Sequence, residues 1–110
     1  MLKSETFFTL LSDETRLRCL FLLQQKGELC VCDLMDALKM IQPKISRHLA
    51  LLRKHKLVIA TRRGTWMYYQ INRALPSWMI KIISCFAEMN QHSKPFSSDL
   101  KRLSQKCSSC

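Results

Sequence analysis

The amino-acid sequence predicts a single, mainly α-helical domain with one small β-hairpin. Three observations lead to this fold class. The chain has 110 residues, 47% of them apolar, which suffices for one hydrophobic core. Most apolar residues recur at helical spacing, and only two glycines and three prolines interrupt the chain. Two runs rich in β-branched and aromatic residues, "LVIAT" and "TWMYYQI", flank the turn sequence "RRG".

The first half of the chain predicts four helices. Ser4 and Ser12 are suited to cap two successive helices, which end near Leu11 and at Gly27. The second of these is apolar nearly all round and is expected at the centre of the domain. A short extended link, "ELC", then leads into a third helix over about 31–40. The fourth helix opens with a proline in its first turn and has one apolar stripe: Ile45, Leu49 and Leu52.

The second half predicts the hairpin, a fifth helix and a tail. Gly64 supplies the positive φ that a tight hairpin turn needs. Pro76 opens the fifth helix, whose apolar stripe predicts burial against a second copy of the chain. That stripe consists of Met79, Ile82, Ile83 and Phe86, widened by Trp78, Cys85 and Met89. The serine- and cysteine-containing tail, 91–110, is expected to be mobile, with a brief helix at 98–106 as an option.

The distribution of charge predicts an anionic partner. The formal net charge is +10, and residues 37 to 87 contain ten basic side chains and no Asp or Glu. A one-signed field over half the chain is typical of nucleic-acid binding. The alternative is that the basic residues serve only solubility.

The order of the elements predicts a winged helix-turn-helix domain over 1–90, with the helix-turn-helix at about 32–54 and the wing at about 57–71. The second helix of such a pair enters the major groove of double-stranded DNA. Gln42 and Arg47 suit base edges, whereas phosphates suit the other polar side chains of the helix and the wing tip. The predicted DNA-binding residues are Gln42, Lys44, Ser46, Arg47, His48, Arg53, Arg62 and Arg63. For any one of them, a merely solvated or packed side chain is an equal alternative.

Cys30 and Cys32 predict a site for a soft metal or metalloid ion, because thiolates are soft ligands. Residues i and i+2 point about 200° apart in an α-helix, but to the same side in an extended chain. Binding one ion through both sulfurs therefore requires the start of the third helix to be unwound or unformed. Cys19 and Cys85 lie on apolar helices and are expected in the core.

The segments "LSDETRLRCLFLL", "ELCVCDL", "QPKISRHLALLR" and "RRGTWMYYQI" resemble the arsenic-responsive repressors of the ArsR family, over about residues 7 to 89. The resemblance implies a homodimeric repressor, joined through its first and last helices, that leaves its operator when arsenite or antimonite (As(III) or Sb(III)) binds the cysteines. The family's fullest motif is Cys-x-Cys-x-x-Cys, and Met35 stands at its third position here. A third ligand is then expected from Cys107, Cys110 or an external thiol or hydroxide.

Other functions are less consistent with the sequence. A thiol-based redox-sensing repressor on the same fold is the main alternative, because four cysteines outside the apolar helices could form disulfides. The fifth helix lacks the ligands of a zinc sensor, and a zinc site built from "CVC" and "CSSC" would have unusually close ligands. An enzyme, an organic cofactor and a membrane-spanning segment are not expected. With no signal peptide, the protein is expected in the cytoplasm.

Overall fold

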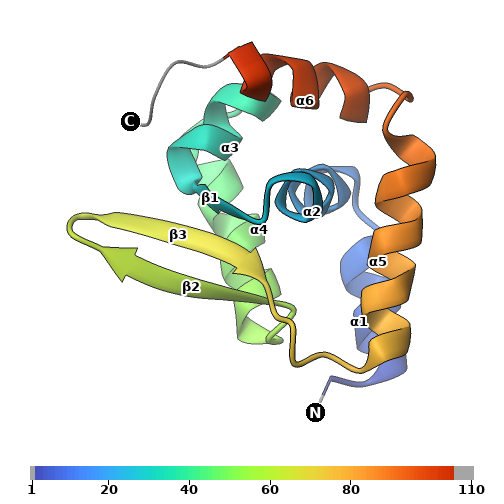
Figure 1. Cartoon of the computed structure of the whole chain (residues 1–110). Helices are drawn as coiled ribbons and strands as arrows, with labels where there is room; N and C mark the ends of the chain where they lie inside the picture. The colour runs from blue at the N-terminus through green and yellow to red at the C-terminus, as the bar shows by residue number, and fades with distance from the viewer. Residues whose placement is uncertain (1, 106–110) are drawn as a thin grey trace.

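The computed structural model describes residues 2–105, which form a helical domain with a three-stranded sheet at one side (Figure 1). In chain order the elements are α1 (Ser4–Leu11), α2 (Glu14–Lys26), β1 (Glu28–Cys30), α3 (Val31–Leu38), α4 (Gln42–Lys54), β2 (Val58–Arg63), β3 (Trp66–Ile71), α5 (Ser77–Asn90) and α6 (Phe96–Gln105). This order confirms the predicted winged helix-turn-helix, in which α3 and α4 are the helix pair and β2–β3 is the wing. None of the described helices is long and apolar enough to cross a membrane.

Helix α2 lies at the centre of the domain, as predicted. Its five consecutive residues from Cys19 to Leu23 are buried, and the other helices surround it (Figure 1). The predicted cap of this helix was wrong by one residue. Asp13, not Ser12, is the N-cap, and its carboxylate accepts the Arg16 amide N–H at 3.1 Å. The Ser12 hydroxyl instead donates to the Thr9 carbonyl at 2.6 Å, at the end of α1.

The sheet has the strand order β1-β3-β2, and all its pairings are antiparallel. Strand β1 was expected only as an extended link, but it pairs with β3, so that Cys30 lies opposite Tyr68. Arg63 lies opposite Trp66, which leaves Gly64 and Thr65 in the turn, and Gly64 has φ +64° as predicted. Since side chains alternate along a strand, Leu29 points to the core while its neighbours in β1 share the other face.

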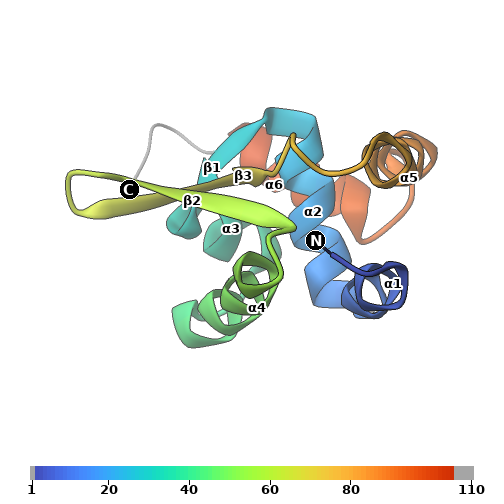
Figure 2. The same ribbon diagram turned by 90° about the horizontal axis from the view of Figure 1, so that it is seen from below.

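Helices α1 and α5 lie side by side and leave apolar surface exposed. The Trp78 ring contacts Phe7, at 5.4 Å between centroids, and Phe8, at 6.1 Å. Phe8 and Trp78 are 51% and 38% exposed. Figure 2 shows the two helices together at one end of the molecule, with the hairpin at the opposite end. The apolar stripe predicted on α5 therefore only partly enters the core of this chain.

The tail differs from the mobile segment that the sequence predicted. Residues Phe96–Gln105 form α6, which packs on α2 and α3. Phe96 is buried between Phe21 and Phe86, at centroid distances of 5.4 and 5.3 Å. The serines and the basic residues of α6 concealed three apolar positions at helical spacing: Phe96, Leu100 and Leu103. Cys107 and Cys110 lie outside the described residues.

Candidate nucleic-acid interface and thiol site

Helix α4 turns one apolar stripe into the core and a polar face outward. Ile45, Leu49 and Leu52 are fully buried, as predicted from their spacing. The end of α3 is marked by Lys39 at φ +55°, and α4 begins three residues later at Gln42. The predicted DNA-binding side chains of α4 are exposed at Gln42, Lys44, Arg47 and Arg53, and half-buried at Ser46 and His48. Figure 2 shows α4 on the lower side of the molecule, beside the base of the hairpin.

His48 lies at the junction of α4 and α2. Its Nδ1 is 3.4 Å from Arg16 Nη1 and 3.8 Å from a carboxylate oxygen of Asp13. Burial, together with the positive charges of Arg16 and Arg47, lowers the pKa of His48, while Asp13 opposes the shift. The DNA contact predicted for His48 stays a prediction. Its ring also ties the helix of the reading head to the start of the central helix.

Asp13 is affected by the same junction. Burial raises the pKa of its carboxyl group, but the hydrogen bond from the Arg16 amide and the charges of His48 and Arg16 outweigh this effect. The net result is a pKa below the usual value for aspartate. Asp13 is therefore ionised over the physiological range and suits the positive end of the α2 dipole.

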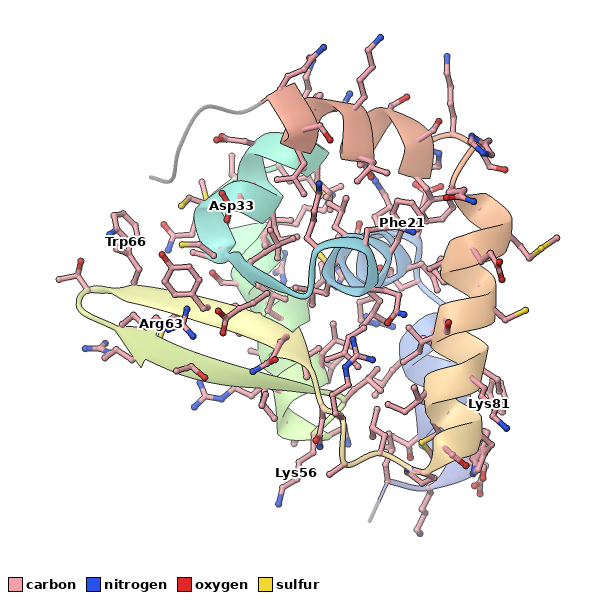
Figure 3. The ribbon with its side chains drawn as sticks, in the orientation of Figure 1. Phe21, Asp33, Lys56, Arg63, Trp66 and Lys81 are labelled. Carbon is pink, nitrogen blue, oxygen red and sulfur yellow. The ribbon has the colours of Figure 1, made fainter. Side chains whose placement is uncertain are left out.

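The two arginines at the wing tip have different surroundings. The Arg63 guanidinium donates to both carboxylate oxygens of Glu28, at 2.6 and 3.2 Å, and lies 5.1 Å from the centre of the Tyr68 ring. Arg62 is exposed, points to the other face of the hairpin and forms no ion pair with the residues that the structure describes. Figure 3 shows Arg63 over the hairpin and Trp66 rising toward the side where Asp33 begins α3. Sequence reasoning treated the two arginines as equivalent.

Cys30 and Cys32 are brought together at the joint between β1 and α3. Cys30 is the last residue of β1 and the N-cap of α3, with extended backbone angles (φ −77°, ψ 155°). The two Sγ atoms are 3.2 Å apart. The rule that i and i+2 diverge applies only when both residues are helical, and Cys30 is not. The expectation that the helix must unwind to bring the sulfurs together was therefore wrong, because α3 is intact from Val31 onward.

A capping box fixes the geometry of this joint. The Cys30 amide N–H donates to the Asp33 carboxylate at 3.0 Å, and the Asp33 amide N–H faces the Cys30 sulfur. Cys30 is 1% exposed and Cys32 is half-buried. The sulfurs thus lie at the N-terminus of α3, where the helix dipole favours negative charge.

The other described cysteines differ from this pair. Cys19 is buried in α2, and burial raises its pKa to about 12, so it remains a thiol, as expected of a core residue. Cys85 was expected in the core but is exposed on α5. Between residues 2 and 105, no three His, Cys, Asp or Glu side chains lie close enough together to hold a metal ion.

Three functional candidates were missed by sequence reasoning. Arg18 and Arg102 both bind Asp99, which is fully buried and joins α6 to the rest of the domain. Asp99 is the only acidic residue after position 88 in a basic, serine-rich tail, and this isolation was an available signal.

Comparison with known proteins identifies the family. Residues 13–60 match the family model described as "Bacterial regulatory protein, arsR family". The arsenic resistance transcriptional regulator ArsR2 of Pseudomonas putida is 47% identical over 90 residues, which are 82% of this chain and 78% of that protein. The chain belongs to the arsR family. Within the family, the arsenical resistance operon repressor of Escherichia coli is 53% identical over 76 residues, which are 69% of this chain and 65% of that repressor.

The fold of this arsR-family member also matches solved structures. One is the homodimeric winged helix-turn-helix DNA-binding domain of a possible ArsR-family regulator from Mycobacterium bovis. It superposes with a TM-score of 0.63 at 28% identity, over 80% of this chain and 79% of that domain.

Proposed function

We propose that this protein is a homodimeric repressor of an arsenic resistance operon, which leaves its operator when trivalent arsenic or antimony binds Cys30 and Cys32. One observation carries the proposal: the two sulfurs are 3.2 Å apart where a wing-bearing sheet joins the helix-turn-helix. The arsenic resistance regulators to which the chain is similar support the same function.

DNA recognition is assigned to the exposed face of α4 and to the wing. Gln42 and Arg47 are exposed in the first half of α4, where recognition helices reach base edges. A bidentate contact from such a side chain gives about 1–3 kcal/mol of discrimination between bases. Lys44, Ser46 and Arg53 are assigned to phosphates, with Arg62 at the wing tip. No Asp or Glu lies between residues 37 and 87 to repel the DNA backbone.

The sulfur separation is consistent with a three-coordinate ion. Two sulfurs that are 3.2 Å apart and each about 2.3 Å from one ion subtend an angle of roughly 90°. Three-bonded arsenic and antimony, which carry a lone pair, form pyramids with angles near this value. A tetrahedral zinc site would need the sulfurs to be about 3.8 Å apart. Thiolate ligands also favour soft ions over hard ones.

Induction is assigned to a change at the β1–α3 joint. A sulfur bound to arsenic has one lone pair fewer for the Asp33 amide, so the capping box that orients α3 is weakened. Helix α3 packs on α4, and β1 pairs with the wing strand β3, so both DNA-binding elements adjoin the site. By linkage, DNA and metalloid weaken each other's binding by the same factor, typically about 5- to 150-fold.

The homodimer is assigned to α1 and α5. Phe8 and Trp78 form a connected aromatic surface across both helices and are substantially exposed in a single chain. A C2 dimer buries such a surface against its own copy and presents two α4 helices to successive major grooves. The homodimeric domain with the same fold supports this arrangement.

The test is fluorescence anisotropy of the protein on DNA from the promoter of its own gene, titrated with arsenite under reducing conditions. We expect release by micromolar arsenite but not by zinc. The variant C30S/C32S should bind DNA with unchanged affinity and ignore arsenite, whereas C85S, which removes an exposed thiol from α5, should respond as the unaltered protein does. DNA binding that arsenite leaves unchanged but peroxide abolishes would assign the protein to redox sensing instead.

A further inference from the structure

Helix α6 is fastened to the domain by one buried carboxylate. Asp99 is fully buried, and Arg18 of α2 binds it with two hydrogen bonds, from Nε at 2.7 Å and from Nη2 at 2.8 Å. Arg102, one turn further along α6, donates to the same carboxylate at 2.7 Å. Two guanidinium groups around one buried carboxylate hold a helix far more firmly than exposed ion pairs do.

The same two arginines cap the C-terminus of α3. Arg102 Nε donates to the Ala37 carbonyl at 2.7 Å, and Arg18 Nη2 donates to the Leu38 carbonyl at 3.4 Å. These are the last two carbonyls of α3, which have no amide partner within the helix. The last turn of α6 is thereby fixed beside the end of α3, and Figure 1 shows the two helices against each other. The cysteine pair lies at the opposite end of the same short helix.

The chain length after α6 is matched to the length of α3. Five residues follow Gln105, and they include Cys107 and Cys110. Helix α3 has eight residues and is therefore about 12 Å long. Five residues of chain span up to about 17 Å. A thiol that starts from the α6 end of α3 can therefore reach the Cys30–Cys32 end.

The chemistry of the proposed inducer calls for one more sulfur. Trivalent arsenic forms three bonds, and no third ligand side chain completes a group of three with Cys30 and Cys32 among residues 2–105. Met35 follows the pair in α3, but its side chain packs against the core cluster. A thioether has no proton to exchange and does not replace a thiolate in this role.

We propose that the C-terminal Cys107/Cys110 pair supplies the third sulfur of the metalloid site, and that α6 is the arm that delivers it. The inference rests on the proposed function and deepens it. Three thiols react with one arsenite molecule: three As–O bonds break, three As–S bonds form, and each thiol proton leaves with a hydroxide as water. Arsenic stays trivalent, so no oxidant or reductant takes part.

The first test maps the thiols that arsenite protects. The full chain, reduced and mixed with equimolar arsenite, is alkylated under native conditions, and the modified cysteines are located by peptide mass spectrometry. We expect Cys30, Cys32 and one tail cysteine to be protected, while Cys85 is modified. Protection of Cys30 and Cys32 alone would overturn the inference and leave the proposed function intact. Protection of neither would overturn the proposed function itself.

Substitution of the tail thiols measures their contribution. In C107S/C110S, we expect at least a tenfold loss of arsenite affinity, together with loss of about one third of the near-ultraviolet absorbance of the As–S bonds. The single variants C107S and C110S show which thiol binds, and C85S is the matched control that should change nothing. An unchanged affinity in the double variant would assign the third bond to an external thiol or hydroxide.

Arg102 tests the arm separately from the thiols. R102Q removes the contacts with Asp99 and Ala37 but keeps every cysteine. We expect a several-fold loss of arsenite affinity, unchanged DNA affinity without arsenite, and partial recovery in R102K. A purely structural role for Arg102 would instead lower the melting temperature and leave the arsenite affinity of the folded protein as it was, which would overturn the role of α6 as an arm.

Discussion

Arg63 and Glu28 join the tip of the wing to the strand that ends in the thiol site. The Arg63 guanidinium donates to both oxygens of the Glu28 carboxylate, and Glu28 lies two residues before Cys30 on the same face of β1. One of the two wing arginines is therefore already neutralised by a residue of the sheet. The charge that the wing offers to DNA depends on this pair.

We predict that the two wing arginines contribute unequally to DNA affinity. R62Q should weaken DNA binding at every salt concentration, and the slope of log K against log [salt] should fall by about 0.9, because one phosphate contact is lost. R63Q should have a smaller effect, since Glu28 already compensates its charge. Fluorescence anisotropy across a salt series measures both slopes.

Substitution of Glu28 tests the same idea from the other side. E28Q frees the Arg63 guanidinium, so DNA affinity should rise a few-fold, in keeping with the small free energy of an exposed ion pair. The double variant E28Q/R63Q should lose that gain. Equal losses in R62Q and R63Q, with no gain in E28Q, would show that Glu28 does not restrain Arg63.

We predict a pH dependence of stability that originates at His48. A histidine whose pKa is lowered in the folded protein binds fewer protons there than in the unfolded chain. The free energy of unfolding should therefore decrease as pH falls through the ordinary histidine value of 6.5 and level off below the lowered pKa of His48. The ionised carboxylate of Asp13 persists through this range, because its own pKa is lowered below 3.8.

The measurement is urea denaturation between pH 7.5 and 5. H48Q should flatten the profile, whereas H92Q, which alters an exposed histidine, should reproduce that of the unaltered protein. A profile that H48Q leaves unchanged would place the titrating group elsewhere.

We predict that Asp99 contributes strongly to stability. D99N leaves the Arg18 and Arg102 guanidinium groups without their anion in a buried setting, where loss of one partner costs about 3–5 kcal/mol. E88Q, which alters an exposed carboxylate on α5, should change the free energy of unfolding by less than about 0.5 kcal/mol. Urea denaturation compares the two variants, and similar small losses would mean that α6 is only loosely attached.

We predict that the aromatic surface of α1 and α5 holds the dimer together. F8S/W78S should raise the dimer dissociation constant at least tenfold, because buried aromatic residues dominate interface energies. I59S removes a wing side chain of similar exposure, and it should leave the dimer unchanged. Sedimentation equilibrium measures the dissociation constants, and a double variant that dimerises normally would move the interface to another face.

Features that depend on local patterns were predictable from the sequence. The buried stripe of α4 follows from the spacing of Ile45, Leu49 and Leu52, and the hairpin turn follows from Gly64. Both are set by residues within one element, so periodicity and turn preference suffice. The thiol pair was found as a pair because its spacing is visible, but its geometry was not. An N-cap residue and a helical residue look alike in a sequence, and this distinction brings the sulfurs of Cys30 and Cys32 to 3.2 Å.

Features that depend on distant partners were not predictable. Strand β1 is three residues long and exists because β3 pairs with it. The packing of α6 depends on Arg18, which lies 81 residues before Asp99. His48 was assigned to DNA by its place on α4, whereas its ring contacts depend on residues at the start of α2. In each case the partner lies outside the window that a pattern covers.

The alternation of side chains along β1 limits how this site can evolve. Leu29 faces the core while Glu28 and Cys30 face away from it, and the strand has no spare residue between Gly27 and the first turn of α3. Insertion or deletion of one residue here would exchange the two faces, burying a carboxylate and turning the thiol into the core. Lineages that keep this sensor can therefore change its ligands by substitution, but they cannot change the length of the segment that carries them.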